Sequence, residues 1–277
     1  MTHTAGATTH TVKRPDGAEL HWEMKGEGPL VVLAHHTLWS HPAVYAGLVD
    51  ELASDHEVVL YDPRGCGGST ARGPYDLETD AADLAGVAEA AGGGALTIAV
   101  GNGFNRTARV GASQPDLISR VIAIAPSAAA ILPRAELKGS DVLAASESVA
   151  ELVLQMMETD PRGALRTMIA ATNPGLDEEQ VRKRVETVAG YLDLDGESER
   201  ARAWLSDDVR EQVRILGDRV WILHGGDDPL FEGVLGARVA ELFPDAHLQQ
   251  VADGPVSRPD ITAGWVRQVS RAATAGR

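Results

Sequence analysis

Short apolar runs alternate with helix-length amphipathic segments through the first half of the chain, and this alternation limits the fold more than any other feature. Such runs, ended by polar or glycine-rich turns, are typical of buried strands in a parallel sheet. The predicted strands span 30–34, 57–61, 96–100, 121–125, 220–224 and 247–251, after a hairpin of 10–13 and 19–25. The predicted helices span 42–54, 76–91 and 260–273. Alternating strands and helices indicate the α/β class.

The middle of the chain follows a different period. Between residues 127 and 216 no strand pattern occurs, and apolar residues recur at helical spacing, as at Leu152, Val153 and Met156. A helical segment placed between two strands of a parallel sheet is expected to form an inserted lid. The sequence therefore predicts a core made of residues 1–126 and 217–277, with a helical lid made of residues 127–216.

Charge and composition exclude several classes of partner. The chain has 25 basic and 40 acidic residues, a net charge of -15, whereas nucleic acids and anionic membranes need a clustered positive surface. No apolar run approaches the roughly 20 residues that span a bilayer, and the N-terminus lacks the apolar stretch of a signal peptide. The single cysteine, Cys66, rules out a multi-cysteine metal site. We expect a cytoplasmic protein without metal or cofactor that takes a small molecule or a modified peptide.

Three motifs follow predicted strands in a fixed order. His35–Thr37 follows the first of the parallel strands, the glycine-rich Asp62–Ser69 loop follows the second, and Gly225–Asp228 follows a late one. In this order they resemble the α/β-hydrolase fold family over essentially the whole chain. The resemblance implies a mostly parallel central sheet flanked by helices, with an inserted helical lid. It also implies that the segment at His35 supplies donors to an oxyanion hole and that Asp228 stands at the place of the triad acid.

Two departures from the family pattern bear on the chemistry. Hydrolases of this fold carry a nucleophile on a sharp strand-to-helix turn, with small residues two positions to either side. The corresponding stretch, Ala99–Asn105, puts Gly101 or Gly103 at the nucleophile position, and glycine forms no acyl intermediate. The family's general base is a histidine after the last strand, but the last histidine here is His247, and Pro255 stands near the expected position. The sequence thus predicts that nucleophile and base are both missing.

Several side chains in these loops are candidates for the site. The catalytic candidates are His35, His36 and Asp228, each of which also has a structural interpretation as a loop or capping residue. Cys66 is expected to be a packed residue rather than a nucleophile. The acidic group at 193–199 lacks the full spacing of a calcium loop and is predicted to be a solvated turn. The predicted substrate-binding residues are Thr37, Trp39, Gly101, Asn102, Gly103, Phe104, Met156 and Phe231.

A site without nucleophile or histidine base still permits proton-transfer chemistry. Backbone N–H groups near Thr37 and Phe104 are expected to stabilise an enolate-like intermediate, which forms when a proton leaves a carbon beside a carbonyl or imine group. The chain resembles the bottromycin epimerase and its relatives, atypical α/β-hydrolase-fold proteins of peptide natural-product biosynthesis. That resemblance implies an isomerase that epimerises the α-carbon of an aspartate beside a thiazoline-type ring in a macrocyclic peptide, assisted by the substrate's own carboxylate.

Two alternatives belong to other functional classes. The first is a non-catalytic protein that binds a hydrophobic small molecule or peptide, for which Met156, Met157 and Met168 would form an adaptable wall. The second is a hydrolase or lyase with a relocated nucleophile or base at His35, His36 or Cys66.

Overall fold

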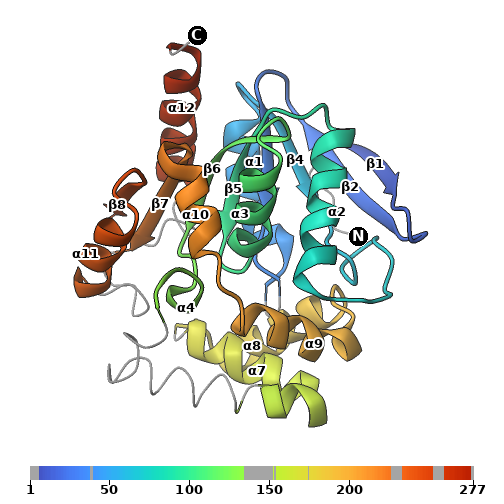
Figure 1. Cartoon of the computed structure of the whole chain (residues 1–277). Helices are drawn as coiled ribbons and strands as arrows, with labels where there is room; N and C mark the ends of the chain where they lie inside the picture. Colours follow the sequence, from blue (N-terminus) through green and yellow to red (C-terminus); the bar gives the residue numbers. More distant parts are fainter. Residues whose placement is uncertain are drawn as a thin grey trace.

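The structure is a computed structural model that describes residues 6–37, 40–133, 152, 154–173, 175–225, 233–251 and 259–275. Its centre is an eight-stranded sheet with the order β1-β2-β4-β3-β5-β6-β7-β8 (Figure 1). The strands are β1 (Thr8–Lys13), β2 (Glu19–Lys25), β3 (Leu30–Ala34), β4 (Glu57–Tyr61), β5 (Ala95–Val100), β6 (Ile118–Ile124), β7 (Val220–Gly225) and β8 (His247–Val251). The β1–β2 hairpin and the β2–β4 pair are antiparallel, and the other pairs are parallel. The predicted α/β class and mostly parallel sheet are confirmed.

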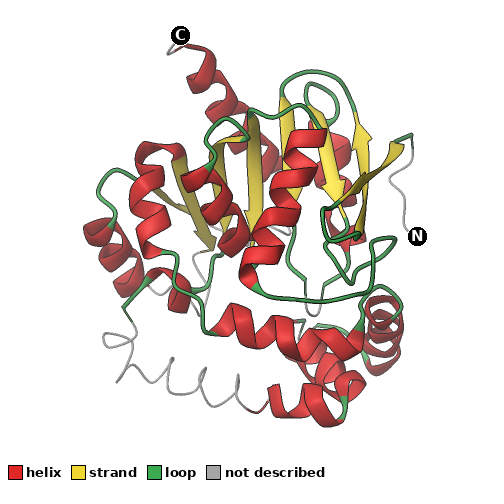
Figure 2. Ribbon diagram, turned by 45° about the vertical axis from the view of Figure 1, so that its right-hand side comes forward, coloured by secondary structure: helices red, strands yellow, loops and turns green. Residues whose placement is uncertain are grey.

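The parallel strands are apolar because helices cover both faces of the sheet (Figure 2). All six residues of β5 are buried, which explains why its sequence shows no alternation. One face is packed by α2 (Leu77–Ala90), α3 (Gly103–Ser113), α10 (Arg210–Leu216) and α11 (Gly233–Leu242), and the other by α1 (Ala46–Leu52) and α12 (Pro259–Ala275). This packing fixes the strand ends from which the site is built.

The helix predicted over 42–54 forms as two pieces, the 3-10 turn η1 (Pro42–Tyr45) and then α1. Pro42 stands in the first turn, where a missing N–H costs nothing. The Nδ1 of His41 accepts the N–H of Ala43 at 3.1 Å and caps the start of η1. The prediction therefore has the right extent but misses the break.

The described part of the segment 127–216 is built from helices. They are α4 (Ala128–Ile131), residues 154–159, α7 (Pro161–Thr172), α8 (Glu178–Ala189), α9 (Leu194–Leu205) and α10. Figure 1 shows α7, α8 and α9 gathered at one end of the sheet. Ile131 and Val213, near the two ends of the segment, belong to the main core cluster. The division into core and lid domains stays a prediction.

The acidic stretch 193–199 differs from the solvated turn that its composition predicts. It begins helix α9, and Glu197 is only 2% exposed, with its Oε1 3.1 Å from Nε of Arg200. The hydroxyl of Tyr75 donates to the carboxylate of Asp193, and the N–H of Tyr75 donates to Glu199 at 3.3 Å. The prediction was wrong because α9 docks against the core, and this contact between distant segments leaves no mark in the local sequence.

Candidate functional site

The turn between β5 and α3 contains two glycines, Gly101 and Gly103, with different structural roles. Gly101 follows β5 directly and has a φ of +52°, in the left-handed region that favours glycine. Gly103 begins α3, and a Cβ there would lie 2.0 Å from the carbonyl oxygen of Ala34, so it permits close packing of helix and strand. Gly101 is flanked two positions away by Ala99 and Gly103. Gly101 is therefore the residue on the sharp turn that the nucleophile takes in hydrolases of this fold.

The imidazole of His36 covers Gly101. A Cβ built on Gly101 would lie 2.5 Å from Nδ1 of His36, and the same Nδ1 accepts the N–H of Asn102 at 3.3 Å. Burial lowers the pKa of His36 to about 3, and the charges of His35 and Arg106 act in the same direction. The ring is therefore neutral near pH 7, and acceptance at Nδ1 assigns its proton to Nε2.

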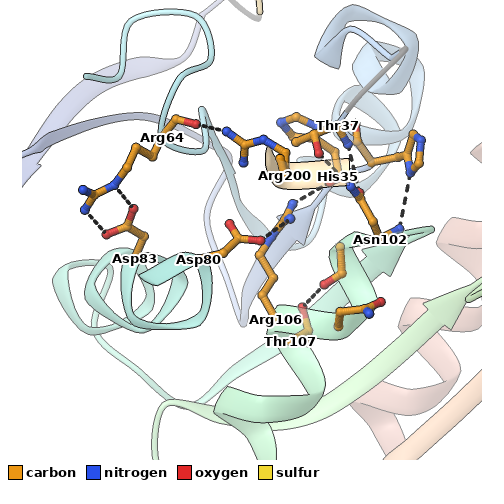
Figure 3. Close-up of polar contacts among 12 residues, drawn as sticks. His35, Thr37, Arg64, Asp80, Asp83, Asn102, Arg106, Thr107 and Arg200 are labelled. Atoms are coloured by element: carbon orange, nitrogen blue, oxygen red, sulfur yellow. Dashed lines mark hydrogen bonds and ion pairs between the residues drawn. The ribbon is translucent and has the colours of Figure 1, made fainter. Parts of the chain in front are cut away.

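Asn102 and Thr37 are joined by two hydrogen bonds (Figure 3). The N–H of Thr37 donates to Oδ1 of Asn102 at 3.0 Å, and Nδ2 of Asn102 donates to Oγ1 of Thr37 at 2.7 Å. Both residues are buried. These two hydrogen bonds hold the loop after β3 against the N-terminus of α3. Both polar atoms of the Asn102 side chain are thus engaged within the protein.

The expected oxyanion donors are already engaged inside the protein. The N–H of Thr37 is bound by Asn102, and the N–H of Phe104 donates to the carbonyl of Gly101 at 3.1 Å, since it lies in the first turn of α3. The N–H of Asn102, next to the turn, is bound by His36. The expectation that backbone donors at Thr37 and Phe104 face a substrate is thus not met in this structure. His36 is thus the side chain that covers Gly101 and also engages the N–H of Asn102.

His35 lies inside the protein and is held from several sides. Its side chain is 0% exposed; Nδ1 lies 2.9 Å from the carbonyl oxygen of His36, and Nε2 lies 3.2 Å from both the carbonyl oxygen of Tyr61 and the hydroxyl of Tyr191. The hydroxyl of Tyr191 donates to Asp62 at 2.9 Å. Burial lowers the pKa of His35 to about 4. These contacts give His35 the structural role of joining the β3 loop to the lid.

Cys66 is a packed residue. Its side chain is 1% exposed and lies in a cluster with Leu165, Ile169 and Val185 of the lid. Burial raises the pKa of the Cys66 thiol, whereas a nucleophilic cysteine needs a lowered one. The geometry thus gives no support to a nucleophile at this position.

Met156 lies in a small apolar cluster of the lid. It packs with Met168 and Trp204 around Met157, and it is half-buried. The indole of Trp204 meets the imidazole of His36 edge to face, with ring centroids 6.0 Å apart. Trp204 therefore connects the methionine cluster to the site. Four further positions named from the sequence lie outside the described residues: Trp39, Asp228, Phe231 and Pro255.

Three polar residues of α3, namely Asn105, Arg106 and Arg109, were not predicted from the sequence. Arg109 forms two hydrogen bonds to the carboxylate of Asp207 at 2.6 and 2.7 Å, and Nδ2 of Asn105 donates to Asp207 at 2.7 Å, which ties the end of the lid to α3. Arg106, one turn after Gly103, is 1% exposed. A run of polar residues on a helix that directly follows a buried strand was the available signal.

The described residues show neither a metal site nor a membrane span. In these ranges no three His, Cys, Asp or Glu side chains gather as metal ligands would. No helix in the same ranges has the length and apolar character needed to cross a bilayer. The cytoplasmic location stays a prediction.

The sheet order and the strand-to-helix turn after β5 define a protein of the α/β-hydrolase class. A model of the alpha/beta hydrolase family matches residues 31–264, so the chain belongs to that family. No curated protein matches the sequence.

Solved structures share the fold over nearly the whole chain. An E-2-(acetamidomethylene)succinate hydrolase has a TM-score of 0.71 and 21% identity, covering 96% of this chain and 99% of that one. A bromoperoxidase from Bacillus anthracis has a TM-score of 0.77 and 17% identity, with 95% and 100% covered. An enol-lactonase from Burkholderia xenovorans LB400 has a TM-score of 0.72 and 20% identity, with 92% and 97% covered. At these identities the likeness shows the fold alone.

Proposed function

We propose that this chain is a non-hydrolytic α/β-hydrolase-fold enzyme that moves a proton at a carbon beside a carbonyl or imine group. The observation that supports it best is the position of His36, whose Nδ1 lies 2.5 Å from the place of a Cβ on Gly101. A nucleophilic side chain has no room at that turn while the imidazole is there. The absence of histidine after His247 also removes the base that would activate a nucleophile.

His36 supplies a neutral hydrogen-bond donor in place of the nucleophile. Its Nδ1 accepts the N–H of Asn102 at the N-terminus of α3, so the positive end of the helix dipole opposes protonation of the ring. A neutral histidine of this kind, with a depressed pKa near a helix N-terminus, polarises a substrate carbonyl in other enzymes. The Nε2–H of His36 then stabilises the oxygen or nitrogen atom that gains negative charge.

In its specific form the proposed reaction is the epimerisation of an aspartate α-carbon beside a thiazoline-type ring in a macrocyclic peptide. The α-proton moves to the substrate's own carboxylate, and the electron pair of the C–H bond enters the adjacent C=N or C=O group. His36 holds the charge that develops there. A proton from solvent is then delivered to the opposite face of the carbon and completes the inversion, and the carboxylic acid releases the abstracted proton to solvent. The resemblance to the bottromycin epimerase group supports this substrate.

Two substitutions of His36 separate the roles of its ring nitrogens. His36→Gln keeps an N–H donor near the position of Nε2, whereas the shorter side chain of His36→Asn keeps an acceptor for the N–H of Asn102 but does not reach the position of Nε2 with its NH2 group. We expect His36→Asn to lower kcat by about 10²- to 10³-fold, the usual effect of removing one such donor, and His36→Gln to lower it less. Chiral analysis of the aspartate recovered from a thiazoline-containing macrocyclic peptide measures the rate of inversion.

Three outcomes would contradict the proposal. Saturable binding of the peptide by the wild-type protein, measured by calorimetry, with no inversion would favour the non-catalytic binding protein. Hydrolysis of the peptide or of simple esters would favour a relocated nucleophile. Wild-type activity in both His36 variants would remove His36 from the mechanism.

A further inference from the structure

Arg106 carries a charge that is almost entirely enclosed by protein. It lies on α3, one turn after Gly103, and its side chain is 1% exposed. Its Nη1 donates to Oδ2 of Asp80 on α2 at 3.1 Å, and its Nη2 donates to the carbonyl oxygen of His35 at 2.6 Å (Figure 3). Its guanidinium also lies over the ring of Tyr61, 5.8 Å from the centroid.

This arrangement costs stability compared with an apolar side chain. Burial of an ion pair is often neutral or unfavourable relative to a packed hydrophobic residue. The cost is higher here because Nε of Arg106 has no hydrogen-bond partner among the described residues. Stability alone therefore does not account for an arginine at this position. We look for the reason in the group to which the guanidinium is hydrogen-bonded.

The group that Arg106 holds is the peptide bond between His35 and His36. The carbonyl of His35 belongs to the peptide that leads into His36, and it is fixed by Arg106. The carbonyl of His36 begins the next peptide, and it is fixed by the imidazole of His35 at 2.9 Å. The backbone on both sides of His36 is thus held by buried side chains, while its Nδ1 is held by Asn102.

The charge of Arg106 acts on the same residue. Among the described residues, the titratable groups whose charges shift His36 are His35 and Arg106, and both lower its pKa, in addition to burial. The positive charge of Arg106 also lowers the pKa of His35. A nearby cation opposes protonation of both imidazoles.

We propose that Arg106 is a positioning residue, whose guanidinium, anchored on Asp80, fixes the His35–His36 peptide and thereby aims the His36 imidazole across Gly101. The tether exists in the substrate-free protein, and its effect on turnover rests on the proposed function. This tether joins α2, α3 and the loop after β3. It therefore links α3, the helix that follows the turn at Gly101, to His36, the residue that covers that turn.

Substitutions of Arg106 test the tether with and without substrate. Arg106→Met removes both hydrogen bonds and the charge, and Arg106→Lys keeps the charge but not the two-pronged geometry. By NMR titration of the histidine rings, we expect Arg106→Met to raise the measured pKa of His36 toward its ordinary value of 6.5. Arg106→Lys should raise it less, because the charge stays while the loss of the two-pronged hold lets the buried ring move. Arg109→Gln, on the next turn of the same helix, is the control that should leave the titration of His36 unchanged.

With the macrocyclic peptide as substrate, Arg106→Met should lower kcat by roughly 10- to 100-fold with little change in KM, since misplacement of a catalytic group acts on turnover. Asp80→Asn loosens the anchor without removing the guanidinium and should give a smaller loss, which keeps the test valid if Arg106→Met fails to fold. A wild-type titration of His36 in Arg106→Lys, which keeps the charge but not the two hydrogen bonds, would overturn the tether, and so would one in Arg106→Met. Lack of turnover in the wild-type protein would instead overturn the proposed function and leave the titration result standing.

Discussion

At the scale of single residues, the chemistry proposed for this chain depends on a glycine and on an imidazole that occupies the space of the glycine's missing side chain. Gly101 has the positive φ of a sharp turn but no side chain to carry, and His36 lies where that side chain would begin. His36 is kept neutral by burial and by its neighbours. The site is thus suited to donating a hydrogen bond, and attack on a carbonyl carbon has no suitable atom at this turn.

Gly101→Ser is the direct test of this interpretation. The new side chain would meet Nδ1 of His36 and adopt a left-handed φ that costs an L-residue about 1–2 kcal/mol. We expect no labelling by a fluorophosphonate probe and a lower urea midpoint than the wild type. Gly175→Ala, where a Cβ would meet nothing within 4 Å, is the stability control. Rapid labelling of Gly101→Ser would show that a serine at this turn can still be activated as a nucleophile.

The sequence predicts single residues well where their role is local. The turn at Gly101 and Gly103 and the packing of Cys66 were predicted correctly, because a sharp turn selects glycine and a tightly packed loop selects a small residue. The contact of His36 with Gly101 and the bond from Arg106 to the carbonyl of His35 were not found. Both join segments about 65 or more residues apart, and pairing at that distance has no signal in one sequence.

At the scale of elements, helix α9 is joined to the loop after β4 by its own polar groups. Arg200 donates to the carbonyl of Arg64 and pairs with Glu197, whose Oε2 has no partner among the described residues. Burial raises the pKa of Glu197 from 4.5 to about 7, although Arg200 opposes the rise; Asp193 and Asp80 add to it. Between pH 4.5 and about 7, Glu197 is therefore mostly protonated in the folded protein, whereas in the unfolded chain it is mostly ionised.

The sign of the pH effect follows from that pKa. Because the folded pKa lies above the unfolded one, the contribution of Glu197 to stability is complete below about pH 4.5 and is lost as the pH rises toward 7, by at most about 1.4 kcal/mol per pH unit. Glu197→Gln should be more stable than the wild type at pH 8 and close to it at pH 4.5, measured by urea unfolding. The exposed Glu211→Gln serves as control. Equal pH dependence of Glu197→Gln and the wild type would refute this role.

Elements with strong local patterns were predicted within a few residues. The inner strands β3, β4 and β5 are almost entirely apolar, and the alternation of such strands with helices along the chain predicts the fold class. The break between η1 and α1 and the docking of the 193–199 stretch were missed. The burial of Glu197 depends on Arg200 and on the core loop beneath it, so composition alone suggested solvent.

At the scale of the whole molecule, one further group has the residue types of a catalytic triad. His56 lies between Asp55, with Nδ1 to Oδ1 at 2.8 Å, and Ser270 of α12, with Nε2 to Oγ at 3.1 Å. Arg267 of the same helix binds Asp55 at 2.7 Å, so the group fastens the last helix to the loop before β4. Fluorophosphonate labelling of Ser270 in the wild type would instead identify a relocated nucleophile.

The mass of the product formed in D2O tests the central claim most directly. When the wild-type protein acts on a thiazoline-containing macrocyclic peptide in D2O, proton transfer exchanges the α-hydrogen for deuterium as the carbon inverts. The expected result is a gain of one deuterium at that carbon, with the peptide otherwise intact and no water added. Recovery of a peptide cleaved by water, with the α-hydrogen retained, would contradict the account.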